Sequence, residues 1–100
     1  MPTKYDLIYL TPAADDFEEI VKYHLVQAGA PSARKIVAAI LKLRDYPLVG
    51  QSHPDRLFAS QGYRKLVLTQ TYVAIYKIIG NTVYIYRIVN GKIKYPSLLV

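Results

Sequence analysis

The residues best suited to chemistry in this 100-residue chain are cations and tyrosines that gather in its C-terminal half. Residues 51–100 carry seven lysines and arginines against one carboxylate, Asp55, whereas residues 1–50 balance six bases with six acids. Such cations bind phosphates or carboxylates and tyrosine rings stack on bases, although tyrosine suits a half-buried sheet surface equally well. The pattern favours a polyanionic partner, namely nucleic acid, a ribosome or an acidic protein segment. The residues expected to bind it are Lys65, Lys77, Tyr84, Tyr86 and Lys94.

Other kinds of chemistry find little support in the sequence. The absence of cysteine excludes disulfide frameworks, thiolate metal sites and cysteine nucleophiles. His24 falls on an apolar helical stripe and is expected to pack inside the fold, whereas His53, in a loop rich in proline and glycine, is expected at the surface. Neither has a second ligand at metal-binding spacing, and the isolated glycines form no phosphate-cradling loop. We therefore expect neither a metal nor a cofactor.

The composition is that of a folded domain. Hydrophobic residues make up 52% of the chain and charged residues 20%, with a net charge of +6, which argues against intrinsic disorder. No apolar run reaches the roughly 18 residues of a membrane-spanning helix, and the N-terminus lacks the pattern of a secretion signal. The sequence thus predicts one domain over residues 1–100, cytoplasmic and without membrane contact.

The first half of the chain predicts one strand and two helices. Strand-forming residues run from Tyr5 to Leu10, after which Thr11 is expected to cap a helix that closes at Gly29. A second helix is expected to begin with Ser32 as its cap and to stop near Asp45, because a proline follows shortly after. The short connection between the two helices predicts an antiparallel hairpin.

The second half predicts strands. Residues 46–62 read as a loop with a short strand around Arg56–Phe58, and three longer strands follow, with a fourth after the turn signal Asn90-Gly91. Helices followed by a run of strands indicate an α+β fold, with a three- to four-stranded antiparallel sheet packed on the helices and the first strand beside one of the later ones. The later strands are expected at Tyr63–Thr69, Tyr72–Ile79, Thr82–Val89 and Lys92–Tyr95.

Hairpin geometry places some of these side chains opposite one another. A two-residue turn at Gly80-Asn81 pairs Lys77 with Tyr84 and Ala74 with Arg87, and the next turn opposes Arg87 to Lys94. Opposed like charges destabilise a sheet, so either an anionic partner neutralises them or the last hairpin splays or takes another register. The same register gathers four side chains on the opposite face, Lys77, Tyr84, Tyr86 and Tyr95.

Several short motifs occur in order along the chain and together resemble a known superfamily. They are Tyr5–Ile8, Thr11–Ile20, Leu43–Gly50, Gly62–Leu66, Tyr72–Tyr76 and Ile88–Tyr95. In this order they resemble the RelE/ParE superfamily of toxins from bacterial type II toxin–antitoxin systems. The resemblance implies a growth inhibitor, often plasmid-stabilising, that a cognate acidic antitoxin neutralises by wrapping around it.

The superfamily contains two mechanisms. RelE-like members enter the ribosome and cleave mRNA without a metal, by driving the ribose 2′-hydroxyl onto the adjacent phosphate while cations stabilise the developing charge. ParE-like members inhibit DNA gyrase. A third possibility is an inactive module that retains only antitoxin binding.

The residues favour the ParE-like alternative. Where the resemblance implies an arginine in the central strand of a nuclease, this chain has Val73, and Asn90 stands where a histidine is often found. The remaining nuclease candidates that the resemblance implies are Arg64, Arg87, Lys92 and Tyr95. Gyrase is therefore the leading expected target, and ribosome-dependent mRNA cleavage is the alternative.

Overall fold

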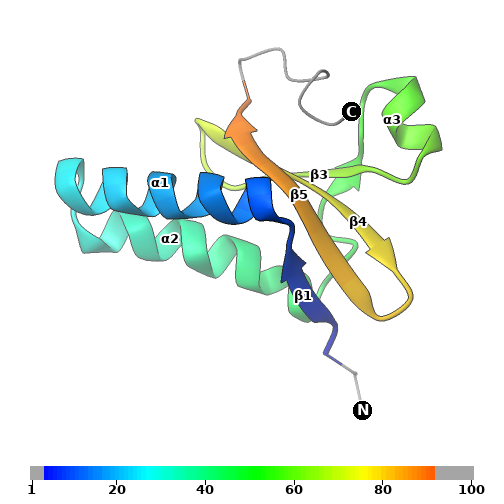
Figure 1. Ribbon diagram of the computed structural model, residues 1–100, viewed down its shortest axis with the longest axis horizontal. Coiled ribbons are helices and arrows are strands. Elements are labelled where there is room, and N and C mark those ends of the chain that lie inside the picture. Colours follow the sequence, from blue (N-terminus) through cyan, green and yellow to red (C-terminus); the bar gives the residue numbers. More distant parts are fainter. Residues whose placement is uncertain (1–3, 92–100) are drawn as a thin grey trace.

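Two long helices and a five-stranded sheet make up the structure, a computed structural model that describes residues 4–91. Figure 1 shows these elements coloured along the chain. In chain order they are β1 (Asp6–Tyr9), α1 (Thr11–Gln27), α2 (Ala30–Leu41), the 3₁₀ turn η1 (Lys42–Arg44), β2 (Gln51–Ser52), α3 (Arg56–Ser60), β3 (Arg64–Val67), β4 (Tyr72–Ile79) and β5 (Thr82–Asn90).

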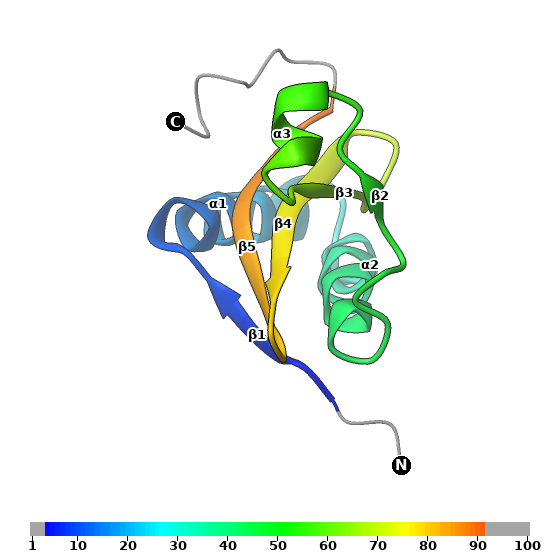
Figure 2. The ribbon, with the colours of Figure 1, turned by 90° about the vertical axis from the view of Figure 1, so that its right-hand side faces the viewer.

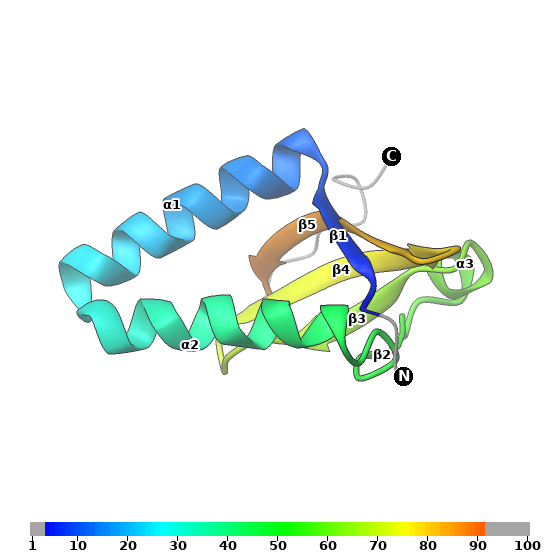
Figure 3. The same ribbon diagram turned by 90° about the horizontal axis from the view of Figure 1, so that it is seen from below.

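The sheet has the order β1-β5-β4-β3-β2. Strands β2 to β5 pair antiparallel with their neighbours, and β1 adds parallel to β5 at the edge. The two long helices lie side by side and cover one face of the sheet (Figure 3). These observations confirm the predicted α+β fold, the helix hairpin and the position of the first strand beside a later one. The predicted fourth strand, Lys92–Tyr95, lies outside the described residues.

Both long helices begin differently from the prediction. Leu10, not Thr11, is the N-cap of α1, and no side chain caps this end. The N-cap of α2 is Gly29, whose φ of 88° is a backbone conformation that glycine adopts easily, and Ser32 lies inside the helix. The hydroxyl oxygen of Ser32 instead lies 2.8 Å from Nδ1 of His24, so the residue joins the two helices side chain to side chain.

The segment after β2 is helical, so the predicted strand around Arg56–Phe58 is wrong. The Asp55 carboxylate accepts hydrogen bonds from the backbone N–H groups of Leu57 (2.9 Å) and Phe58 (3.2 Å). An aspartate cap of this kind satisfies backbone donors at the start of a helix and here turns the chain into α3. The two-residue strand β2, which pairs with β3, was not predicted.

Two hydrophobic clusters lie on opposite faces of the sheet. The larger packs the helices against the sheet and includes Ala13, Ile20, Ile36, Ile40, Leu43, Ala74, Tyr76, Val83, Ile85 and Ile88. The smaller contains Phe58, Tyr63, Val73, Ile75 and Val89. In Figure 2, α3 lies in front of the sheet while α1 and α2 lie behind it. Among the described residues, no helix is long and apolar enough to cross a membrane.

Candidate functional site: a cationic, tyrosine-rich sheet face and the loop beside it

Six of the nine predicted binding and catalytic residues belong to the described part of the chain, and these six lie on three adjacent strands of the sheet. Arg64 and Lys65 lie on β3, Lys77 lies on β4, and β5 carries the remaining three described ones, Tyr84, Tyr86 and Arg87. The other three, Lys92, Lys94 and Tyr95, lie outside the described residues. The structure brings some of the six together and separates others.

Lys77 is the centre of a cluster of tyrosines. Its Nζ atom lies 4.2 Å from the ring centroid of Tyr63 and 5.4 Å from that of Tyr86, within the range of cation–π attraction. The two rings meet edge to face with centroids 5.0 Å apart. Tyr84 is the cross-strand partner of Lys77, as predicted. We call Tyr63, Lys77, Tyr84 and Tyr86 the tyrosine–lysine cluster.

The tyrosine–lysine cluster combines a cation with packed aromatic rings. Phe58 of α3 packs edge to face against Tyr63, with ring centroids 5.6 Å apart. Burial raises the pKa of Tyr63, and the neighbouring Tyr86 raises it further, so the Tyr63 hydroxyl keeps its proton at neutral pH. An ammonium group over phenol rings offers positive charge and flat aromatic surface, which suits a carboxylate, a phosphate or a stacked ring.

An irregularity in the sheet changes the cross-strand partner of Arg87. The predicted pairing holds from Ile79–Thr82 to Tyr76–Ile85, but a β-bulge follows, and Arg87 pairs with Ile75 instead of Ala74. The predicted pairing of Ala74 with Arg87 is therefore wrong. A β-bulge places two residues of one strand opposite one residue of the other, and here it lies directly beside Arg87.

The partner of Arg87 is Asp16 of α1. Nε of Arg87 lies 2.7 Å from one carboxylate oxygen and Nη2 lies 2.8 Å from the other. The backbone N–H of Ile88 donates to the same carboxylate at 3.0 Å. The hydrogen bond to Asp16 raises the pKa of Arg87 above its already high value. An anionic partner is one expected means of neutralising Arg87, and the structure shows that Asp16 of the same chain does so.

Arg64 is also committed to the fold. Its Nη2 donates to the carbonyl oxygens of Leu48 (3.2 Å) and Gly50 (2.5 Å), and its Nε donates to the hydroxyl of Tyr76 at 3.4 Å. That buried hydroxyl donates to the Pro47 carbonyl (2.8 Å) and accepts from the Gly50 N–H (3.1 Å). Together, Arg64 and Tyr76 hold the loop of residues 47–50 against the sheet.

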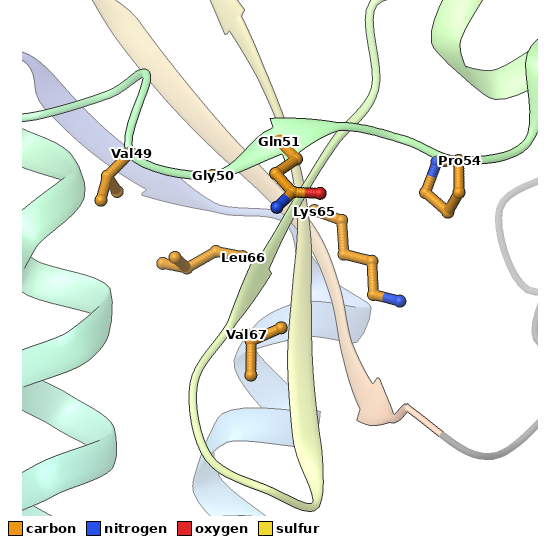
Figure 4. A pocket seen from close by; sticks show the side chains of 7 residues that line it. All are labelled: Val49, Gly50, Gln51, Pro54, Lys65, Leu66 and Val67. Carbon is orange, nitrogen blue, oxygen red and sulfur yellow. The ribbon is translucent and has the colours of Figure 1, made fainter.

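Gly50 is required where this loop crosses the sheet. A Cβ atom at this position would lie 2.5 Å from the Tyr76 hydroxyl and 2.7 Å from the Lys65 carbonyl oxygen, closer than packed atoms approach. Figure 4 shows the hollow of about 260 Å³ beside this crossing, where Lys65 and Leu66 point to opposite sides of β3. Lys65 is thereby directed away from the helix side, on which Leu66 packs.

The histidines support the structure. His53 is 6% exposed, so the predicted surface position is wrong. Its Nδ1 accepts a hydrogen bond from the Asp55 N–H at 3.0 Å, its ring packs on Phe58, and burial lowers its pKa. His24 packs against Tyr72 and Ser32, as expected for a residue inside the fold.

Sequence reasoning missed Tyr63, Tyr76 and Gly50. Tyr63 and Gly50 stand in the quoted motifs Gly62–Leu66 and Leu43–Gly50, and Tyr76 ends Tyr72–Tyr76. Their contacts span many residues, 26 between Gly50 and Tyr76, so the local pattern marked their positions without showing what they touch.

The sequence matches a known family of toxins over most of its length. The sequence model of the ParE toxin of type II toxin–antitoxin systems (parDE) matches residues 7–95. The chain belongs to the ParE toxin family. The RelE/ParE resemblance of the sequence is thereby confirmed, and the protein is a type II toxin. Among curated proteins, no match is found.

Solved structures of other toxins share the fold of this ParE family member. One, from the chromosomal ParDE toxin–antitoxin system of P. aeruginosa, is 25% identical with a TM-score of 0.59, covering 87% of this chain and 96% of that one. The RelBE2 toxin–antitoxin complex of Mycobacterium tuberculosis is 22% identical with a TM-score of 0.64, and the match covers 88% of this chain and 99% of that one. A YoeB/ParE toxin from Agrobacterium tumefaciens is 18% identical with a TM-score of 0.61, and the match covers 85% of this chain and 97% of that one.

Proposed function

We propose that this toxin arrests growth by binding DNA gyrase and that RNA cleavage is not its activity. The observation that carries the proposal is the state of the two described arginines of the nuclease set. Arg87 is held by both oxygens of Asp16, and Arg64 is held by the loop and Tyr76. A cation that stabilises a developing phosphate charge must face the reacting phosphate, whereas both of these guanidinium groups give their Nε and Nη2 donors to the protein's own oxygens.

The residue at the nuclease arginine position supports the same proposal. Val73 is 4% exposed and packs in the hydrophobic cluster under α3 with Phe58 and Val89. A charged side chain at this position would be buried without a partner, at a cost of several kcal/mol. The sheet is therefore packed for an apolar residue where the nuclease pattern needs a cation.

In this proposal the toxin is neutralised in the cytoplasm by a cognate acidic antitoxin. Its net charge of +6 and its membership of a family of toxin–antitoxin systems support this partner. The ParDE system of P. aeruginosa and the RelBE2 complex of M. tuberculosis each pair such a toxin with an antitoxin. An acidic segment lying over the cationic strands would bind more weakly as salt screens the charges.

A second candidate function is ribosome-dependent mRNA cleavage. The observation that favours it is the tyrosine–lysine cluster, in which Lys77 lies 4.2 Å from the Tyr63 ring. Aromatic rings beside a cation are the usual means of holding single-stranded nucleic acid.

The two functions differ in what they do to a cell. The toxin is expressed in a bacterial host that carries a DNA-damage reporter, and mRNA 5′ ends are mapped in the same culture. Gyrase poisoning induces the reporter and leaves messages intact, and Tyr95→Phe stays fully toxic. Codon-phased cuts in translated messages, abolished by Tyr95→Phe, would establish the nuclease instead. Growth without either effect would contradict both.

A further inference from the structure

An apolar hollow opens at the end of the molecule where the chain enters β1. It has a volume of about 590 Å³ and is lined by Tyr5, Tyr46, Pro47, Leu48, Val49 and Ile78. Three of these side chains are largely exposed, Tyr46 at 67%, Leu48 at 69% and Val49 at 51%. Scattered exposed apolar residues are ordinary, but a group of them around a hollow is typical of an interaction site.

A second, polar hollow shares a wall with the first. It has a volume of about 270 Å³, and Leu48 and Ile78 line both hollows. Its other lining residues include Tyr63 and Arg64, which belong to the site described above. The two hollows therefore adjoin at Leu48 and Ile78, one of them mainly apolar and the other more polar.

The charge at this polar hollow is positive. Nη2 and Nε of Arg64 are used within the fold, whereas Nη1 makes no hydrogen bond to any residue among 4–91. Lys77 does not line the hollow itself, but its Nζ lies 4.2 Å from the ring centroid of Tyr63, which does, and it is a second cation beside the hollow. The carboxylates nearest along the chain, Asp45 and Asp55, line neither hollow, and Asp55 caps α3.

The charge also selects the kind of occupant. A second copy of this chain would bring another net charge of +6 to a surface that is already cationic, and the two would repel each other. An acidic segment of a different protein is complementary both to the whole chain and to Arg64 and Lys77.

We propose that the two hollows together are the docking site for a segment of the cognate antitoxin. The segment places a large apolar side chain among Tyr46, Leu48 and Val49 and, close to it in sequence, an aspartate or glutamate against Arg64 and Lys77. The inference rests on the proposed function, in which an acidic antitoxin neutralises the toxin. Apolar anchors supply most of the affinity at such interfaces, and rim charges supply salt dependence and association rate.

The test measures the affinity of the full-length cognate antitoxin for the folded toxin by titration calorimetry. Leu48→Ser removes the exposed apolar side chain and leaves the backbone carbonyl that Arg64 holds. We expect the Kd to rise about tenfold or more, as at a binding hot spot. Lys77→Gln removes one cation, and we expect a smaller rise together with a weaker dependence of Kd on salt.

Two control variants change the same chemistry elsewhere. Val26→Ser removes an apolar side chain that is 80% exposed on α1, and Lys35→Gln removes an exposed charge from α2. Neither is expected to change Kd by more than about twofold. Thermal unfolding of every variant confirms that the fold is kept.

The outcomes separate the inference from the proposed function. If wild-type toxin does not bind the antitoxin at all, the proposed function fails in its antitoxin partner. If wild type binds and Leu48→Ser binds equally well, the docking site is overturned and the proposed function stands. If Leu48→Ser keeps antitoxin affinity but loses toxicity, the hollow belongs to the target, and the inference is likewise overturned.

Discussion

Arg87 on β5 and Asp16 on α1, 71 residues apart in the chain, form an ion pair through two hydrogen bonds of 2.7 and 2.8 Å. The side chains are only 22% and 16% exposed, so the pair is partly shielded from water. The same carboxylate also accepts a hydrogen bond from the Ile88 N–H, so it ties helix α1 to the backbone of β5 beside the bulge.

Asp16→Asn is expected to lower the free energy of unfolding by about 2 kcal/mol, between the small effect of an exposed pair and the large effect of a fully buried one. The variant removes the charge that compensates Arg87 while nearly preserving the shape of the side chain. Urea unfolding followed by circular dichroism measures the change.

Glu18→Gln is the matched control, since it breaks the exposed pair of Glu18 with Lys22, whose side chains are 63% and 71% exposed. We expect no measurable change in stability from it. Equal losses in the two variants would show that Asp16 does not clamp α1 to the sheet.

Tyr76→Phe is expected to destabilise the protein by about 1–3 kcal/mol, since the buried N–H of Gly50 and C=O of Pro47 lose their common partner. Tyr84→Phe serves as the control, because the Tyr84 hydroxyl makes no hydrogen bond to residues 4–91. Thermal unfolding of both variants gives the comparison. A Tyr76→Phe protein as stable as wild type would contradict the proposed role of this hydroxyl in holding the loop.

Gly50→Ala is expected to cost about 1–3 kcal/mol, the usual cost of forcing an extra group into a packed site. The nearest obstruction is the Tyr76 hydroxyl, 2.5 Å from the added Cβ, so the two positions are coupled. In a double-mutant cycle, Gly50→Ala therefore loses less stability when Tyr76 is already phenylalanine. Strictly additive losses would mean that the alanine clashes with the backbone alone.

Burial of His53 is expected to make the free energy of unfolding depend on pH. Burial lowers its folded-state pKa below the value of about 6.5 in the unfolded chain, so the folded state favours the neutral ring. Its contribution is complete above that unfolded value and is lost as the pH falls from about 6.5 towards the folded pKa. Protonation also turns Nδ1 from an acceptor into a donor and breaks the bond from the Asp55 N–H.

His53→Asn keeps an acceptor near the position of Nδ1 and does not titrate. We therefore expect the variant to lose less stability than wild type between about pH 7.5 and pH 5, measured by urea unfolding at each pH. His24 is present in both proteins and cancels in the comparison. An identical pH dependence in the two proteins would contradict this assignment.

The sequence was most informative where structure is set by neighbouring residues. The Gly80-Asn81 turn predicted the pairing of β4 with β5 correctly from Ile79–Thr82 to Tyr76–Ile85. Beyond it the bulge shifts the pairing by one residue, and no local pattern encodes an inserted residue of this kind. The Asp55 cap, in contrast, followed a recognisable rule and could have predicted α3.

Contacts between distant segments could not be predicted from the sequence. The acids of α1 all lie beyond its first turn, where the helix dipole acts most strongly, and Asp16 instead neutralises Arg87. The hollow lined by Leu48 likewise depends on three segments meeting, the entry to β1, the loop after η1 and the end of β4. Family motifs marked Gly50 and Tyr63, but only their three-dimensional neighbours give these positions a physical reason.

The central claim, that the toxin binds gyrase and does not cleave RNA, is tested most directly with purified components. Toxin is added to DNA gyrase in an ATP-dependent supercoiling assay and, in parallel, to ribosomes translating a defined message. We predict that supercoiling is inhibited, that cognate antitoxin reverses the inhibition, and that the message stays intact. Unimpaired supercoiling together with cleavage of the message in the ribosomal A site would contradict the account.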